Sequence, residues 1–334
     1  MNQISPEAAA PALVIEPRAV PQWRRWAASQ EAILLIAIVA LFVVVGAINP
    51  RYLAERNIED IFLANAYIAI AAIGMSMMIV SGNIDISVGS LIGVLGTVSG
   101  ALAKSDYPLI VAWLAPLVLG VLAMSFMGLI VAYLRIPSVV VTLGMLSILK
   151  GGLISVTGGR WISDLPDAFH LYDASVLGAP MPVFLMVVLT VAAAIWMRYA
   201  PLGRTLYAVG GNPEAARLAG ISRERTTMMA FAIHGLFAGI AAVMWGTQFR
   251  VIQSTTPPGL ELTVITAAVV GGVSILGGAG TVIGATLAAI LLAAIGSSLI
   301  FIDVSPYWLR AVQGALILVT VLADLARRRR AMRR

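Results

Sequence analysis

Long apolar runs separated by short polar segments dominate the hydropathy pattern of this chain. A helix that spans a membrane needs about 20 mostly apolar residues. Ten segments approach that length, at 32–48, 58–80, 84–103, 108–134, 137–157, 181–198, 226–249, 262–276, 279–301 and 306–325. The pattern therefore predicts an all-α, polytopic transmembrane bundle of about ten spans, built from residues 31–325.

The composition agrees with this assignment. Of the 334 residues, 60% are hydrophobic and 11% are charged, whereas a soluble domain carries about 45–50% apolar and about 25% charged residues. These values exclude an ordinary soluble enzyme, a disordered chain and a coiled coil. The chain has no cysteine, so disulfides, thiolate metal sites and cysteine nucleophiles are also excluded.

The basic residues indicate how the chain is oriented in the membrane. Six arginines lie in the last eight positions, directly after an apolar run, and the polar segment 1–30 carries three more. Cytoplasmic segments are enriched in Lys and Arg, so we expect both the tail 1–30 and the basic tail 326–334 to be cytoplasmic. The predicted external loops then hold only five basic residues, Arg51, Arg56, Lys104, Arg160 and Arg250. This placement favours a membrane partner over nucleic acid as the reason for the net charge of +6.

The chain lacks the motifs of an autonomous enzyme. A phosphate-binding P-loop needs Gly-Lys-Ser/Thr, but the two lysines, Lys104 and Lys150, follow Ala103 and Leu149. The two histidines lie far apart in the sequence, and no His-Glu-x-x-His or G-x-S-x-G motif is present. We therefore expect no catalytic residues, no metal site and no cofactor in this chain. Energy for uphill transport must come from an ion gradient or from another polypeptide.

Two spans are interrupted by glycine-rich segments, at 82–90 and 271–280. Non-helical backbone at membrane depth is tolerated only where protein or a water-filled cavity covers it, although small residues also promote close helix packing. Polar residues inside the spans are candidates for the translocation path, namely Asn65, Asn83, Asp85, Ser87, Thr142, His234, Gln248 and Gln313. Each of them can equally be an interhelical hydrogen bond, and Asp85, which precedes a helix start, can cap that helix.

The segment 199–225 is the one long loop predicted on the cytoplasmic side. Asn212 suits an N-cap, Pro213 the first helical turn, Glu214 the positive end of the helix dipole, and Gly220 the C′ position. These signals predict a seven-residue helix from 213 to 219, about 10 Å long. So short a helix is marginal in isolation and needs docking to persist.

The side chains of this short helix indicate two possible partners. Its alanines leave one side smooth enough to enter a groove, while Glu214 and Arg217 offer charge. A cytosolic protein is one possible partner, and the lipid headgroups of the membrane surface are the other.

The segment 210–221, Gly-Gly-Asn-Pro-Glu-Ala-Ala-Arg-Leu-Ala-Gly-Ile, resembles the coupling-helix signature of a known family. That family comprises the permease subunits of bacterial ABC sugar importers of the ribose, xylose and arabinose group. Three further blocks, at 82–90, 137–151 and 261–284, are similar to the same family in the same order. The resemblance covers about residues 35–325. Asn83 stands where the family frequently has glycine, and Ile86 stands where it has leucine.

The resemblance implies a function and a set of partners. It implies a multi-pass permease of the bacterial inner membrane that carries a monosaccharide or similar solute, without a nucleotide site of its own. ATP and Mg²⁺ would be bound by a cytosolic ATP-binding subunit, a second permease subunit would complete a homodimer or heterodimer, and an extracytoplasmic sugar-binding protein would deliver the solute. The residues that would couple to the ATP-binding subunit are Gly211, Asn212, Pro213, Glu214, Ala215, Ala216, Arg217 and Gly220. A stand-alone secondary transporter or facilitator of a small polar solute is the alternative.

Overall fold

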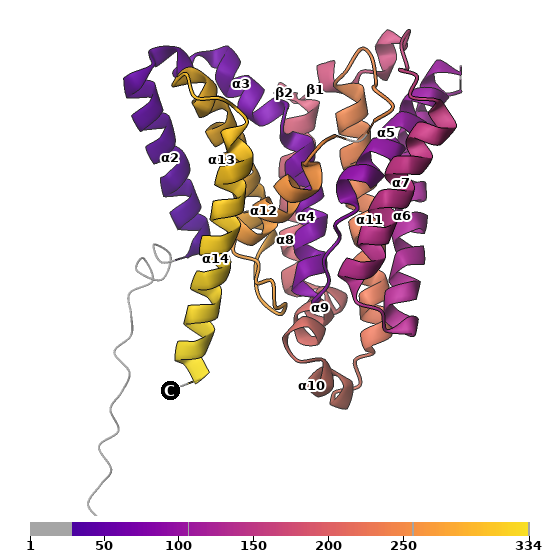
Figure 1. The fold of residues 1–334 in the computed structure, drawn as a ribbon, viewed down its shortest axis with the longest axis vertical. Coiled ribbons are helices and arrows are strands. Elements are labelled where there is room, and N and C mark those ends of the chain that lie inside the picture. Colours follow the sequence, from indigo (N-terminus) through magenta and orange to yellow (C-terminus); the bar gives the residue numbers. More distant parts are fainter. Residues whose placement is uncertain (1–28, 106, 256, 333–334) are drawn as a thin grey trace, which may run out of the picture.

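A computed structural model describes residues 29–105, 107–255 and 257–332, so most of the predicted N-terminal tail 1–30 lies outside the described residues. The described chain is almost entirely helical (Figure 1). The first part contains α2 (Gln30–Ile48), η1 (Pro50–Leu53), α3 (Glu55–Leu63), α4 (Ala66–Val80), α5 (Val88–Lys104), α6 (Leu109–Leu134), α7 (Ser138–Thr157), η2 (Asp167–Phe169), η3 (Leu171–Asp173), β1 (Ser175–Val176) and β2 (Ala179–Pro180). The remainder contains α8 (Met181–Tyr199), α9 (Pro201–Gly211), α10 (Pro213–Leu218), α11 (Arg223–Thr247), α12 (Leu260–Val270), α13 (Val282–Phe301) and α14 (Trp308–Met332).

The all-α prediction is confirmed, because the short antiparallel pair β1–β2 is the only sheet in the described residues. In the part of the chain that the structure describes, eight helices are long and apolar enough to cross a membrane, with α3 and α4 counted as one interrupted helix, and α5 and α12 are shorter apolar helices. Each of the ten predicted spans therefore corresponds to an apolar helix. That the chain crosses ten times, with both termini in the cytoplasm, stays a prediction.

The sequence-based bounds are wrong at the two glycine-rich interruptions. Helix α5 begins only at Val88, and α12 ends at Val270, so 82–87 and 271–281 are not helical. Gly82 and Gly272 have φ angles of +85° and +92°. Glycine reaches this region without the steric penalty that other residues pay, and the positive φ values end the helices there.

The two short helices α5 and α12 begin at the same place and run in opposite directions. A Cβ added to Gly89, in the first turn of α5, would lie 3.1 Å from the backbone nitrogen of Glu261, in the first turn of α12. The far end of α5 carries Lys104, which pairs with Asp164, whereas α12 leads into loop 271–281 at the opposite end of the molecule (Figure 1). The residues around the two starts share an order, Asp85-Ile-Ser-Val and Glu261-Leu-Thr-Val. Discontinuous helices with starts inside the bundle are typical of transporters.

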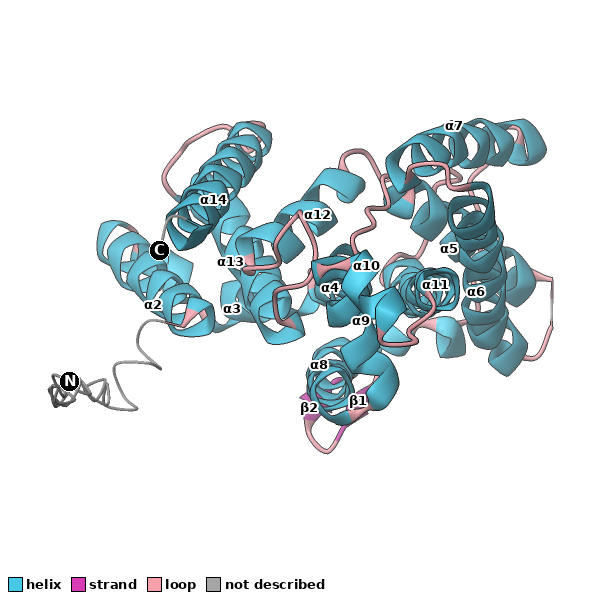
Figure 2. Ribbon diagram, turned by 90° about the horizontal axis from the view of Figure 1, so that it is seen from below, coloured by secondary structure: helices cyan, strands magenta, loops and turns pink. Residues whose placement is uncertain are grey.

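Helices α4 and α11 lie at the centre of the bundle, and small residues bring their neighbours close. Nearly every side chain of α4 is buried. A Cβ on Gly74 would lie 2.7 Å from Cβ of Phe237 on α11, and Gly235 packs against Gly120 of α6. Close backbone approach through such residues is how membrane helices associate. Helices α2, α7 and α14 lie at the periphery (Figure 2) and leave most of their apolar side chains uncovered, as expected for contact with lipid.

Both ends of the described chain lie at one end of the molecule. We call this the α10 end, and the opposite one, which carries β1 and β2, the hairpin end (Figure 1). Gln30, at the start of α2, donates to the carbonyl oxygen of Val270 at 3.0 Å. Asp324 of α14 accepts a hydrogen bond of 2.6 Å from Ser274 in loop 271–281. Helix α14 continues to Met332, through most of the segment predicted as the tail 326–334.

Candidate functional site

The predicted coupling helix is present as α10, one residue shorter than expected. Its N-cap is Asn212, whose side-chain oxygen accepts a hydrogen bond of 3.0 Å from the backbone N–H of Ala215. Gly220 has a φ of +80°; its N–H donates to the carbonyl of Arg217 at 3.0 Å, and the N–H of Ile221 donates to that of Ala216 at 2.9 Å. These two bonds form a Schellman motif. The capping roles predicted for Asn212, Pro213 and Gly220 are confirmed.

The outer surface of α10 combines an ion pair with an exposed apolar side chain. Arg217 and Glu214 pair at 3.2 Å, and both are well exposed. Ala216 is buried, which anchors the helix to the bundle, while Leu218 is 81% exposed. Leu218 was not among the predicted contact residues, although an apolar residue within a polar cytoplasmic segment was a usable signal. The surface offers both charge and apolar area to a partner.

A second helix precedes α10 where the sequence predicted only loop. Helix α9 begins at Pro201 and ends at Gly211, with Leu206 and Val209 buried. Its Tyr207 hydroxyl donates to the carbonyl of Gly280 at 2.9 Å. Proline in the first turn and glycine at the end are the ordinary helix start and stop signals, so these residues could have revealed α9 in the sequence.

The end of α9 meets the end of α4 and loop 271–281 at a junction of five glycines, Gly82, Gly210, Gly211, Gly277 and Gly278, which we call the glycine junction. A Cβ on Gly210 would overlap the carbonyl oxygen of Val80 and lie 2.8 Å from the nitrogen of Gly278. A Cβ on Gly277 would lie 3.1 Å from Cα of Gly82. The Gly278 N–H donates to the Val80 carbonyl at 2.8 Å. The residues just before α10 are thus packed, backbone against backbone, on both non-helical segments.

Three of the predicted path residues, Asp85, Ser87 and His234, share buried hydrogen bonds, and a fourth, Thr142, bonds to the backbone beside them. Asp85 and His234 are both 0% exposed, and their Oδ2 and Nε2 atoms lie 3.0 Å apart. The other carboxylate oxygen of Asp85 accepts hydrogen bonds from the backbone N–H and the hydroxyl of Ser87, at 2.7 Å and 2.6 Å. The Thr142 hydroxyl accepts from the N–H of Ile86 at 3.1 Å. These bonds tie the segment before α5 to α7 and α11. The predicted capping of α5 by Asp85 is not observed, because Ser87 is the N-cap residue and Asp85 accepts from Ser87 rather than from the helix itself.

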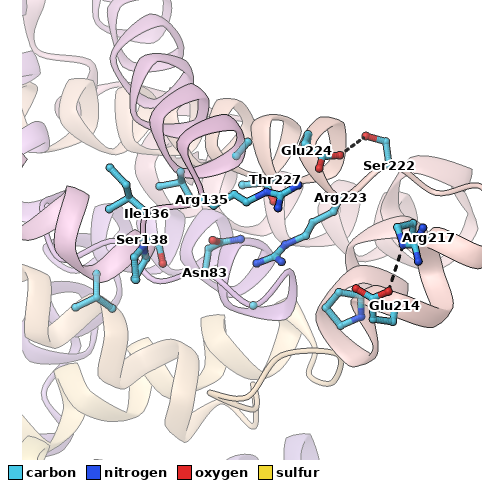
Figure 3. Close-up of a pocket in the computed structure, with 16 residues that line it drawn as sticks. Asn83, Arg135, Ile136, Ser138, Glu214, Arg217, Ser222, Arg223, Glu224 and Thr227 are labelled. Atoms are coloured by element: carbon cyan, nitrogen blue, oxygen red, sulfur yellow. Dashed lines mark hydrogen bonds and ion pairs between the residues drawn. The ribbon is translucent and has the colours of Figure 1, made fainter.

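The remaining four path candidates lie in three different places. Asn83 is among the residues that line a cavity of about 770 Å³ at the α10 end, whose walls also include Arg135, Glu214 and Arg223. Figure 3 shows Arg223 extending across this cavity toward Asn83. Arg135 was not among the predicted path residues. The cavity brings α10 together with the turn between α6 and α7.

Asn65 and Gln313 line a second cavity, of about 420 Å³, which we call the hairpin-end cavity. Gln313 is 2% exposed, and its side-chain nitrogen donates to the Thr263 hydroxyl at 3.1 Å. Asn65 lies at the break between α3 and α4. Gln248, the last candidate, follows the end of α11 and lines neither of these cavities.

Comparison with known proteins places the chain in a family. The family model described as "Branched-chain amino acid transport system / permease component" matches residues 57–321. Autoinducer 2 import system permease protein LsrC of Salmonella typhi is 38% identical over 297 residues, which covers 89% of this chain and 86% of that protein. The LsrC protein of Escherichia coli (strain K12 / DH10B) is 35% identical over 297 residues, with 89% and 87% covered. No solved structure matches the chain.

The match covers most of the bundle, from α3 to α14, and includes α10 and both non-helical segments. The apolar helices make the chain a multi-pass protein of the inner membrane. Its relatives are transport components rather than enzymes. The chain belongs to the family of ABC-importer permease subunits, as its four sequence blocks suggested.

Proposed function

We propose that this chain is the translocation subunit of an importer for a small sugar-like solute, driven by a separate ATP-binding subunit that docks on α10. The observation that carries this proposal is α10 itself. It is a short helix with caps at both ends, an exposed ion pair and an exposed Leu218. A helix of this length needs docking to persist. Ala216 packs it on the bundle, and its capped outer surface is exposed for a partner.

A movement of docked α10 would be transmitted to the rest of the bundle through the two helices next to it in the chain, α9 and α11. The helix follows α9, whose end is packed on Val80 and loop 271–281 through the glycine junction. It also precedes α11, which holds Asp85 through His234. Rigid elements with two packing arrangements can convert a displacement at one site into a rearrangement at another. ATP-driven closure of the partner would thus move both discontinuous helices, α5 and α12.

The other proposed partners follow from family membership. ATP and Mg²⁺ would be held by the ATP-binding subunit, a second permease subunit would pair with this one, and an extracytoplasmic binding protein would dock at the hairpin end. That end is braced by Arg250, which pairs with Asp167 at 2.8 Å and Asp173 at 3.1 Å. All three side chains are well exposed, so this surface offers charge to a docking protein. Autoinducer 2, which the names of the relatives carry, is the first solute to test.

The test is uptake into proteoliposomes with and without the ATP-binding subunit. We expect uptake to require that subunit together with ATP, because the chain has no P-loop. The variant Leu218→Glu should abolish ATP-dependent uptake and weaken binding of the subunit. Leu177→Glu is a matched control for binding of the ATP-binding subunit, because Leu177 is 93% exposed at the opposite, hairpin end, and this variant should retain that binding.

Concentrative uptake by this chain alone would refute the proposal and support a stand-alone secondary transporter. Retention of normal coupling in Leu218→Glu would show that α10 is not the docking element.

A further inference from the structure

We propose that a cavity at the α10 end, which we call the α8 cavity, binds the anionic headgroup of a phospholipid of the surrounding membrane. Its walls are formed by the end of α8, by α9, by the start of α13 and by Glu31 in the first turn of α2. Its volume of about 630 Å³ lies within the usual range for small-molecule sites, about 300–1,000 Å³. It shares no lining residue with the cavity beside α10.

The α8 cavity lies at the depth of the lipid headgroups. Helix α8 is an apolar candidate span of 19 residues, which makes it about 28 Å long at 1.5 Å per residue. The hydrocarbon core of a membrane is about 30 Å thick, so the end of α8 at Arg198 and Tyr199 falls at the membrane–water boundary. The Arg198 guanidinium lies 5.4 Å from the centre of the exposed Tyr199 ring. Exposed tyrosines are typical of this boundary.

The polar part of the lining carries a net positive charge. Arg198 ends α8, and Arg204 lies in the first half of α9. Neither forms a salt bridge with any residue that the structure describes. The one acid of the lining, Glu31, accepts a hydrogen bond of 2.7 Å from the Thr281 hydroxyl. Two unpaired guanidinium groups against one hydrogen-bonded carboxylate favour an anion, and guanidinium groups match the geometry of phosphate.

The apolar part of the lining continues into a surface that suits an acyl chain. Ile195 of α8 and Ile283 of α13 line the cavity, and both are exposed. Val187 and Val191, also exposed, precede Ile195 at intervals of four residues, so the three side chains lie in one line along α8. This line leads from the cavity toward the hairpin end, the direction in which the acyl chain of a lipid held by its headgroup would run.

Charge beside apolar walls distinguishes the α8 cavity from two other hollows of the surface. The groove on α6 is lined only by apolar residues, among them Ile110 and Val118, and offers nothing to a headgroup. The cavity beside α10 has arginines, but Glu214 and Glu224 line it as well. A free phosphate in the α8 cavity would leave its apolar walls uncovered, whereas a phospholipid would cover both parts. Basic pockets between membrane helices on the cytoplasmic side are a known type of headgroup site.

A lipid in the α8 cavity would contact residues that hold α9 against the start of α13. Tyr207, in its wall, donates to the carbonyl of Gly280 at 2.9 Å. Thr281, also in its wall, caps α13 by accepting from the N–H of Gly284 at 3.1 Å. A ligand that binds the folded chain and not the unfolded one stabilises the fold. We therefore expect an anionic phospholipid to stabilise the protein.

The test uses the full chain, purified in detergent, with phosphatidylglycerol, phosphatidylcholine or inorganic phosphate added in turn. The thermal unfolding midpoint is measured, and native mass spectrometry counts the lipids that stay bound. We expect phosphatidylglycerol to raise the midpoint more than phosphatidylcholine and to stay bound, and inorganic phosphate to have no effect. Equal effects of the two lipids would overturn the proposed recognition of charge. An equal effect of inorganic phosphate would show a site for free anions and would overturn the assignment to lipid.

Arginine variants locate the effect in the α8 cavity. The double variant Arg198→Gln/Arg204→Gln should raise the phosphatidylglycerol concentration that gives half of the stabilisation by about tenfold. The double variant Arg198→Lys/Arg204→Lys should retain most of the response, because the charge remains. Arg225→Gln is the matched control, since it removes an exposed arginine at the same end of the molecule that lines neither cavity. A wild-type response in the double glutamine variant, or an equal loss in Arg225→Gln, would overturn the inference.

The apolar wall has its own variant. Ile195→Gln places a polar group on the proposed path of the acyl chain and should weaken retention of phosphatidylglycerol in the mass spectrum. Val118→Gln, on the apolar groove of α6, is the control and should leave retention unchanged. Equal retention in the two variants would show that Ile195 does not contact the lipid, and would overturn the proposed path.

Discussion

At the scale of single residues, the fully buried Asp85 carboxylate holds the segment before α5 in place. It accepts hydrogen bonds from the backbone and hydroxyl of Ser87, and its second oxygen lies against Nε2 of His234. A carboxylate only accepts hydrogen bonds, so Nε2 carries the hydrogen that His234 donates. Buried polar groups that lose their partners cost far more than the bond itself contributes. Asp85 thus connects the start of α5 to α11 through buried hydrogen bonds.

Replacing Asp85 tests this role. Asp85→Ala leaves three buried donors without their acceptor, and we expect it to destabilise the folded chain by about 1–3 kcal/mol or more. Asp85→Asn retains an acceptor and should cost less. The measurement is the thermal unfolding midpoint of the purified protein in detergent. Ser147→Ala, on the exposed side of α7, serves as the control, and equal midpoints for Asp85→Ala and this control would contradict the proposed role.

At the scale of elements, the glycine junction brings together three segments that lie far apart in the sequence, the ends of α4 and α9 and the loop 271–281. The ends of α4 and α9 and the loop 271–281 approach so closely that side chains there would collide with backbone. The hydrogen bond from Gly278 to Val80 and that from Tyr207 to Gly280 hold the arrangement. Because the backbones are in direct contact there, we expect a displacement of α9 and α10 to move the adjoining segments as well.

Gly210→Ala tests the junction. The added methyl group would overlap the Val80 carbonyl oxygen, and we expect a loss of about 1–3 kcal/mol from overpacking or a shifted junction. In the assembled importer, the ratio of solute moved to ATP hydrolysed should then fall.

Gly144→Ala is the matched control, because Gly144 lies in α7 with open space around its Cβ position. Alanine is the better helix former by about 1 kcal/mol, so this variant should be neutral or more stable. A Gly210→Ala protein with the stability and coupling ratio of the control would exclude the junction as a transmission element.

At the scale of the whole molecule, the fold has two discontinuous helices that start together and diverge toward opposite ends. The described chain starts and finishes at the α10 end, where Gln30 and Asp324 both bond to the region 270–281. This arrangement predicts an even number of crossings. Together with the excess of arginine in the segments on this side, it predicts that the α10 end is cytoplasmic.

Two single-cysteine variants test this orientation. Leu177→Cys, at the hairpin end, should react with a membrane-impermeant maleimide in intact right-side-out vesicles. Leu218→Cys, on α10, should react only after the vesicles are permeabilised. Both positions are more than 80% exposed, at 93% and 81%, so access to the reagent decides the result. The reverse labelling pattern would show that the α10 end is extracytoplasmic and would contradict the predicted orientation.

Local signals accounted for much of what the sequence predicted. The apolar runs predicted the helical bundle because the length of a span depends only on consecutive residues. The caps of α10 were predictable because Asn212, Pro213 and Gly220 act within one turn of their own helix. The same signals at Pro201 and Gly211 mark α9, which lies in the segment 199–225 predicted as a loop. The assignments of path residues and of ten crossings remain predictions.

The sequence by itself determined the apolar helices of the bundle, the caps of α10 and the family, because each depends on neighbouring residues or on blocks of them. Only the tertiary structure decided which polar groups meet. Asp85 and His234 are 149 positions apart, and Gln313 reaches Thr263 across 50. The glycine junction likewise forms from glycines of three separate segments, and nothing in the sequence distinguishes these glycines from the others. Contacts of this kind depend on how the helices pack, and helical periodicity does not specify the partner.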